Sequence, residues 1–279
     1  MTQQEIRDVF ACLYRDGLRF VFVQGGEPLL RRDLPAILQD LVEIGFQLTL
    51  ITNGTKLTSR LVRQFDDLSI AVSISLDTLD RNKYERIRGV DQLDEVLAGL
   101  DLLRHYRRPK FLTCIVSEIN RDEVNEVVAF AGQRGFFPIV GAYHWDVGLY
   151  GKQSPTLMYE RRQARTIFER LLEEDALPLG YFRQYAKDNV TWLRGERLKP
   201  CDAGLYSIAV DASGNVSPCL SLPAAGNLLH SSLGEILSRF DRQSIRRCSD
   251  QSSCNRLDGR VVGSVLRHPI AAWQTPVSW

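Results

Sequence analysis

The sequence lacks any apolar run long enough to cross a membrane. The clearest short run, residues 19–23, is far below the ~20 residues that a membrane-spanning helix needs. The first residues contain no apolar signal core. Charge of one sign is also not in excess, because 35 Lys and Arg face 34 Asp and Glu. We therefore predict a cytoplasmic protein with no membrane partner and no nucleic-acid partner.

The composition is otherwise that of a folded protein. The 279 residues are 44% hydrophobic and 25% charged, and we find no internal repeat and no low-complexity tract. This length is ample for a sizeable buried core. The six cysteines of a cytoplasmic chain are expected to be metal ligands or buried thiols rather than disulfides.

Helical and strand patterns alternate through the first half of the chain, beginning with a helical stripe at Ile6, Val9, Phe10 and Leu13. The order strand–helix recurs about five times, which predicts a parallel sheet with helices outside it. We expect the strands at 20–23, 47–51, 69–76, 111–116 and 137–140, and the intervening helices at 34–44, 59–65, 93–105 and 122–134. Because the first element is a helix, we expect that the chain begins one element late.

The strand at 69–76 favours one kind of sheet over another. Its even-numbered positions are apolar, whereas Ser73, Ser75 and Asp77 share the opposite face. A polar inner face suits an open barrel that encloses a ligand, whereas a flat doubly wound sheet would be apolar on both faces. The predicted fold class is therefore α/β, with a partial barrel.

The pattern changes beyond residue 141. An aromatic loop at 143–150 contains His144, Trp145 and Asp146, which are candidates for contact with a substrate or simply part of a surface loop. A charged helix is expected at 156–174. From Cys201 onward, short strands and turns predominate. We place a boundary between 180 and 201, which gives predicted domains at 1–185 and 186–279.

The motif Gly25-Gly26-Glu27-Pro28 follows the strand at 20–23, a short unbroken β-prone run that we expect to be buried on both faces. Ligands of open α/β sheets bind beyond the carboxyl ends of the strands. Paired glycines allow a ligand to approach the backbone, whose carbonyls accept hydrogen bonds from an ammonium group. A plain strand-to-helix turn is the alternative for Gly-Gly alone, but a carboxylate fixed before a rigid proline favours a binding site.

Polar residues also end the next strands. Together they would surround one pocket at the same edge of the sheet, although each alone is typical of a turn or a helix cap. These residues are Thr52, Asn53, Ser75, Asp77 and Asn120.

Four cysteines lie in the last third of the chain. A hairpin between Cys201 and Cys219 would bring these two sulfurs together, and Cys248 and Cys254 follow an expected helix at 232–240. Four thiolates ligate either zinc or a [4Fe–4S] cluster. The five-residue gap before Cys254 is unlike a zinc knuckle and favours iron and sulfur, while four unrelated buried thiols remain the alternative. We expect Cys12 and Cys114 to be core residues.

In this order, the motifs resemble the radical S-adenosylmethionine (SAM) superfamily, in the subgroup with a C-terminal SPASM or Twitch auxiliary-cluster domain. The resemblance runs from about residue 5 to residue 259. It implies a partial (β/α)6 barrel that lacks its first strand, followed by a small Cys-rich α+β domain. The motifs that carry it are Gln24-Gly-Gly-Glu-Pro-Leu-Leu30, Ile51-Thr-Asn-Gly54, Ser73-Ile-Ser-Leu-Asp77 and Cys-x12-Gly-x4-Cys from Cys201.

The resemblance also implies cofactors and their binding residues. Gly25, Gly26 and Glu27, with Pro28 beside them, would hold the amino group of SAM. Ser75 would approach its ribose or methionyl part. The strand at 137–140 would lie against the adenine through its backbone. Thr52, Asn53, Asp77 and Asn120 would line the same cavity. Cys201, Cys219, Cys248 and Cys254 would hold one auxiliary [4Fe–4S] cluster.

In the family, a second [4Fe–4S] cluster bound by Cys-x3-Cys-x2-Cys transfers an electron to SAM and so generates a 5′-deoxyadenosyl radical. The 279 residues contain no such triad. We therefore expect an oxidoreductase or maturase that is inactive as given, with the catalytic cluster present only in a full-length form. The implied partners are a peptide or small-molecule substrate and a reductant such as flavodoxin or ferredoxin. The alternative is a non-catalytic iron–sulfur or zinc protein that binds a peptide or a partner.

Overall fold

The computed structural model describes residues 1–144, 154–252, 254–257, 260 and 265–275. Contacts divide these residues into two compact units. Unit 1 comprises Met1–Ile115 and Asp122–Ile139, and unit 2 comprises Val116–Arg121 and the described residues beyond Ile139. This division falls within two strands of the sheet, whereas the expected boundary after residue 185 falls within a helix. The domain limits 1–185 and 186–279 therefore stay a prediction.

The first half of the chain alternates strands and helices, as predicted. Its strands are β1 (Phe20–Val23), β2 (Gln47–Thr52), β3 (Ala71–Ser75), β4 (Lys110–Val116) and β5 (Phe137–Ala142). Its helices are α1 (Gln3–Arg15), the 3₁₀ turn η1 (Pro28–Leu30), α2 (Leu34–Ile44), α3 (Ser59–Asp67), α4 (Arg81–Arg88), α5 (Leu93–Leu102) and α6 (Val124–Gln133).

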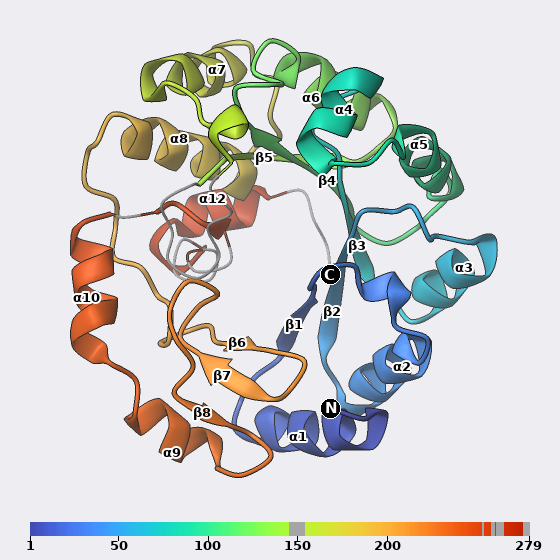
Figure 1. Ribbon diagram of the computed structural model, residues 1–279, viewed down its shortest axis with the longest axis vertical. Coiled ribbons are helices and arrows are strands. Elements are labelled where there is room, and N and C mark those ends of the chain that lie inside the picture. The colour runs from blue at the N-terminus through green and yellow to red at the C-terminus, as the bar shows by residue number, and fades with distance from the viewer. Residues whose placement is uncertain (145–153, 253, 258–259, 261–264, 276–279) are drawn as a thin grey trace. The chain divides into compact units, whose positions relative to one another are not determined.

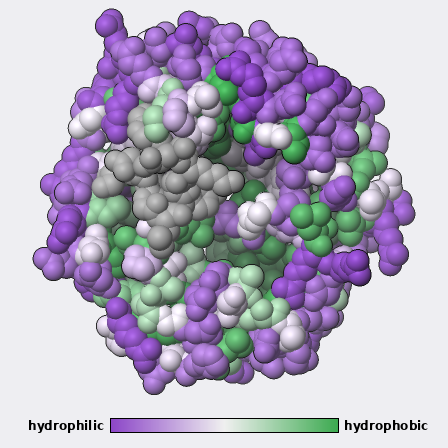
Figure 2. All heavy atoms as spheres, in the orientation of Figure 1, coloured by the Kyte–Doolittle hydropathy of each residue, from purple (hydrophilic) through white to green (hydrophobic). Residues whose placement is uncertain are grey.

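The five strands form one sheet in chain order, and β1 to β4 pair in parallel. Helices α2–α6 lie along the outer side of the strands (Figure 1). At the rim where these helices lie, the molecular surface is mainly hydrophilic (Figure 2). The sheet and its helical cover confirm the predicted α/β class and are consistent with a partial barrel.

The two faces of β3 differ as its alternation predicts. Val72 and Ile74 are completely buried on the helix-covered face, where a buried aliphatic side chain contributes about 1.5–3 kcal/mol. On the opposite face, the Ser73 hydroxyl lies 2.9 Å from the Thr113 hydroxyl of β4. Ser75 is only partly buried. The inner face of this sheet is therefore polar at β3 and β4.

Local sequence signals explain where the helices begin and end. Thr2 and Glu5 form a capping box at the start of α1. Gly45 ends α2 with a φ of 115°, a left-handed conformation that suits glycine. Asp80 caps α4, which has only one buried residue, Tyr84, and therefore shows no apolar stripe. For that reason α4 was not predicted.

Unit 2 contains the remaining elements. These are η3 (Pro155–Leu157), α7 (Arg161–Glu173), α8 (Tyr181–Leu193), β6 (Ala209–Val210), β7 (Asn215–Ser217), β8 (Gly226–Asn227), α9 (Leu233–Ser238), α10 (Arg242–Asp250) and α12 (Pro269–Gln274). Strands β6 and β7 form the predicted antiparallel hairpin. Val216, Ile236 and Phe240 form the small hydrophobic core behind it.

Helix α8 lies in the stretch between 180 and 201, where we expected a boundary, and it buries residues along its length. Two other expectations were wrong. Strand β1 was expected to be buried, but its Phe20 and Phe22 side chains are exposed. Cys12 was expected in the core, but its side chain is exposed on α1, whereas Cys114 is buried as predicted. None of the described helices is both long and apolar enough to cross a bilayer.

Candidate functional site

The Glu27 carboxylate joins the motif after β1 to the end of β2. One oxygen accepts hydrogen bonds from the Thr52 hydroxyl at 2.6 Å and the Leu29 backbone N–H at 3.0 Å. The other accepts from the backbone N–H of Asn53 at 2.8 Å. Thus two of the sequence motifs meet at one carboxylate. A carboxylate with these donors is fixed in position, because hydrogen bonds to a charged group are the strong ones.

The backbone at Gly25 and Gly26 is open. Both residues are exposed, and a Cβ atom built on either one would meet nothing within 4 Å. Pro28 follows as the first residue of η1, whose N-cap is Glu27. The carbonyls at the two glycines are therefore accessible to a ligand, while the neighbouring Glu27 side chain is held in place.

The side chains of Thr52 and Asn53 accept hydrogen bonds within the turn after β2. The Thr52 hydroxyl oxygen accepts from the Gly54 N–H, and the Asn53 amide oxygen accepts from Thr55. Helix α5 packs tightly against this turn at Gly99, where a Cβ atom would lie 2.5 Å from the Gly54 carbonyl oxygen. Only glycine permits this approach, so α5 fixes the turn beside Glu27.

Asp77 is buried, and its carboxylate is bound by other residues of the protein. Its carboxylate forms an ion pair with Arg88 at 2.7 Å and accepts from the Ile115 N–H at 2.8 Å. Asn120 lies in unit 2, where its side-chain oxygen accepts from the Ser117 N–H. Their roles as cofactor-binding residues stay predictions, as does that of the partly buried Ser75.

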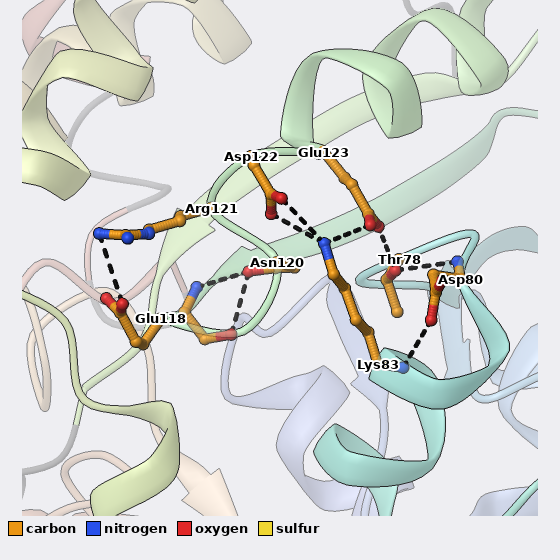
Figure 3. Close-up of polar contacts among 9 residues, drawn as sticks. Thr78, Asp80, Lys83, Glu118, Asn120, Arg121, Asp122 and Glu123 are labelled. Carbon is orange, nitrogen blue, oxygen red and sulfur yellow. Dashed lines mark hydrogen bonds and ion pairs between the residues drawn. The ribbon is translucent and has the colours of Figure 1, made fainter.

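A network that the sequence patterns did not reveal connects the loops after β3 and β4 within unit 1 (Figure 3). The Lys83 ammonium of α4 bonds Asp122 at 2.9 Å and also pairs with Glu123. Glu123 in turn accepts from the Thr78 hydroxyl. Asp122 and Glu123 lie far from Lys83 in the sequence, so no local pattern pairs Lys83 with them.

All four predicted cysteine ligands line one cavity of about 30 Å³ in unit 2. They come from three segments: the loop before β6, the turn after β7, and α10 with the chain that follows it. Apolar and cationic side chains complete the wall. The lining comprises Cys201, Ala203, Cys219, Ser221, Leu222, Ile245, Cys248, Cys254, Arg256 and Arg260.

Hydrogen bonds between segments hold the cysteines at this cavity. The Cys201 N–H donates to the Ser249 hydroxyl at 2.8 Å. Arg260 donates to the carbonyls of Cys254 and Lys199. It therefore links Cys254 to the chain just before Cys201. These hydrogen bonds therefore fix the backbone next to Cys201 and Cys254 without a bound metal.

The surroundings of the cysteines affect their protonation. Burial raises the pKa of the Cys254 thiol to about 12, and proximity to Cys248 and Cys201 adds to this rise. Burial also raises the pKa of Cys201, while Arg260 opposes the increase. Metal ligands must be thiolates, so binding of a cation at this cavity would displace protons.

The donor set of this cavity matches the cofactor expected from the sequence. Four cysteine thiolates are the ligands of a [4Fe–4S] cluster. Within the described residues, no group of three or more Cys, His, Asp or Glu side chains is arranged to hold a metal ion. The four thiols line one shared cavity, and this donor set fits a cluster.

His144 contacts the chain immediately after Cys254. Its Nε2 accepts from the Asn255 N–H at 3.0 Å, and its ring stacks on Trp192 of α8. Burial, with Arg256 nearby, lowers the pKa of His144 to about 3. A neutral, partly buried imidazole thus supports the chain next to Cys254, and contact of His144 with a substrate stays a prediction. Trp145 and Asp146, the other candidates there, lie outside the described residues.

Comparison with known proteins identifies two families in the chain. The family model of the radical SAM superfamily matches residues 1–131, and that of the SPASM iron–sulfur cluster-binding domain matches residues 201–256. The second match contains all four cysteines of the cavity. The chain belongs to the radical SAM superfamily and carries a SPASM domain, and these two domains imply SAM and [4Fe–4S] clusters as cofactors.

Among curated relatives, a probable GTP 3′,8-cyclase of Sulfurisphaera tokodaii is 30% identical over 234 residues, which cover 79% of this chain and 72% of the relative. Another, of Pyrococcus abyssi, is 36% identical over 135 residues, or 48% of this chain and 44% of the relative. The chain thus spans less than half the length of the Pyrococcus relative that it matches.

Solved structures share the fold at low identity. The structure of native anSMEcpe with bound AdoMet (SAM) superimposes with a TM-score of 0.67 at 16% identity, covering 89% of this chain and 75% of the other. SuiB of Streptococcus suis bound to the precursor peptide SuiA also gives 0.67 at 16% identity, with 87% and 58% covered. These similarities confirm the radical SAM architecture.

Proposed function

We propose that unit 1 binds SAM and that unit 2 holds one auxiliary [4Fe–4S] cluster, as parts of a radical SAM oxidoreductase or maturase. The observation that carries this proposal is the convergence of Cys201, Cys219, Cys248 and Cys254 on one cavity within the stretch matched by the cluster-binding family. Such a cluster supplies electron transfer near the reacting molecules when it is bound.

In unit 1 the proposed role of the chain is to bind and orient SAM. Glu27 holds the chain after β1 against the end of β2 and leaves the carbonyls at Gly25 and Gly26 open to an ammonium group. A fixed backbone of this kind lowers the ordering cost of binding. Because the 279 residues contain no Cys-x3-Cys-x2-Cys, we propose that this polypeptide by itself binds SAM without cleaving it.

The proposed substrate is a peptide or a related natural-product precursor. Its support is that two structures with this fold were solved with peptides, one with the precursor peptide SuiA and one with the Kp18Cys peptide. A second candidate is GTP, favoured by the activity named for the Sulfurisphaera relative. Calorimetric titration of GTP into the SAM-loaded protein separates the two, since micromolar binding would favour the nucleotide.

Anaerobic reconstitution tests the cluster site. We expect about four irons and four sulfides per chain, with broad absorbance near ~400 nm. Single serine substitutions at Cys201, Cys219, Cys248 and Cys254 should each reduce the bound iron. Serine at the exposed Cys12 is the matched control and should leave the iron content unchanged. One zinc per chain without sulfide would contradict the proposal and support a zinc protein.

Glu27→Gln tests the SAM site. A glutamine amide cannot present two acceptor oxygens, so one of the three hydrogen bonds at Glu27 is lost and the loop loosens. We expect SAM affinity measured by calorimetry to fall about tenfold, as about 1.4 kcal/mol of binding free energy is lost. Glu126→Gln, on the exposed surface of α6, removes the same charge and should leave the affinity unchanged. Equal affinities for both variants would exclude this role of Glu27.

A further inference from the structure

The four-cysteine cavity contains a hydroxyl group that the protein does not satisfy. Ser221 lines this cavity, and its Oγ atom is buried without a hydrogen-bond partner. A buried hydroxyl left without a partner costs about 1–3 kcal/mol. The four thiols line the same cavity, together with Ala203, Leu222 and Ile245, which carry no side-chain acceptor.

The backbone of Ser221 already forms a hydrogen bond with a cysteine sulfur. Its N–H donates to the Cys219 Sγ at 3.4 Å. The turn that makes this possible is closed by the Leu222 N–H, which donates to the Cys219 carbonyl. Ser217 donates its own hydroxyl to the same carbonyl at 2.9 Å. Ser221 therefore donates its backbone N–H to the Cys219 sulfur, and its hydroxyl is a second donor that has no partner.

We propose that the Ser221 hydroxyl donates a hydrogen bond to a sulfur of the auxiliary cluster and raises its reduction potential. Thiolate and sulfide sulfurs accept hydrogen bonds, and the bond strengthens as the cluster gains an electron and becomes more negative. The reduced state is then stabilised more than the oxidised one. Hydrogen bonds to the sulfurs are among the features that set the potential of such clusters.

The charge on the cavity wall acts in the same direction. Arg256 and Arg260 line the cavity, and their guanidinium groups favour the more negative state of anything bound there. Ser221 differs from these arginines because its hydroxyl can be removed without changing a charge. Its effect on the potential can therefore be measured by itself.

The inference rests on the proposed cluster, so the iron content of the wild-type protein is measured first. The full chain is reconstituted and the midpoint potential of its cluster is determined by a redox titration followed by electron paramagnetic resonance. For Ser221→Ala we expect the ratio of reduced to oxidised cluster at a fixed potential to fall up to about tenfold, which is 59 mV for one electron. Ser221→Thr, which keeps the hydroxyl, should stay near the wild-type value.

Ser217→Ala is the matched control, because it removes a hydroxyl from the same turn that bonds a carbonyl rather than the cavity. An unchanged potential in Ser221→Ala overturns the inference, as does an equal shift in Ser217→Ala. If Ser221→Ala loses its iron, Ser221→Thr and Ser221→Val are compared, since they share a shape and differ in the hydroxyl. A more negative potential for valine supports the inference, and equal potentials overturn it. A wild-type chain without iron overturns the proposed function itself.

Discussion

His144 makes contacts that require a neutral imidazole. Its Nε2 can accept from the Asn255 N–H only when that nitrogen carries no proton, and the ring also hydrogen-bonds the backbone of Ala142. Burial enforces the same state, since it lowers the pKa of His144 to about 3. This single side chain thus links the end of β5 to the residue after Cys254, both in unit 2.

The stability of the metal-free protein should therefore depend on pH through His144. In the unfolded chain a histidine titrates near ~6.5, so between about 6.5 and 3 the unfolded state binds a proton that the folded state does not. The stability contribution is complete above pH ~6.5 and is lost as the pH falls towards 3. We expect the urea midpoint to fall between pH 7.5 and pH 5, and less so in His144→Gln. Identical pH dependence in both proteins would exclude His144 as the cause.

The contacts at the proposed SAM site could be predicted only in part. Glu27, Thr52 and Asn53 were expected near one another because parallel strands end at the same edge of a sheet, and their hydrogen bonds confirm this proximity. The ion pair between Asp77 and Arg88 was not predicted, since Arg88 lies on a helix without an apolar stripe. Periodicity detects burial, and long-range charge pairing leaves no periodic signal.

At the scale of elements, α8 had the largest unexpected role. It was not predicted, because the stretch between 180 and 201 was expected only to contain a domain boundary. The helix holds the chain on both sides of Cys254 by two hydrogen bonds. Trp192 Nε1 donates to the Ser252 carbonyl at 3.0 Å, and the Tyr185 hydroxyl donates to the Asn255 carbonyl at 2.9 Å. The position of Cys254 therefore depends on a helix that precedes the cysteine-rich segment.

Tyr185→Phe tests this role of α8. Loss of one buried hydrogen bond should cost about 1 kcal/mol of unfolding free energy. Tyr106→Phe is matched to it, because the Tyr106 hydroxyl also donates to a buried carbonyl, that of Ile70 in unit 1. Both variants should lose similar stability, but only Tyr185→Phe should release iron severalfold faster to a chelator. Equal release rates would show that α8 does not support the cysteines.

Strand β1 provides a second prediction for an element. Among the described residues it has a strand neighbour only on the side of β2, and Phe20 and Phe22 are exposed by 57% and 45%. An exposed apolar edge strand promotes association. We expect Phe20→Lys with Phe22→Lys to reduce the self-association of this polypeptide in sedimentation velocity, with little change in its thermal unfolding midpoint. A midpoint that drops by many degrees would mean that these side chains are buried in solution.

At the scale of the molecule, the proposed function gives each of the two compact units its own ligand, so each ligand should stabilise its own unit first. A ligand that binds only the folded state adds stability according to its concentration and affinity. Removal of iron with a chelator should therefore raise amide hydrogen exchange in β7, α9 and α10 and leave β2 and β3 unchanged. Addition of SAM should instead protect η1 and the turn after β2. Exchange that rises equally in both units on iron removal would show that they unfold as one, and the two sites would then have to be treated as a single cooperative system.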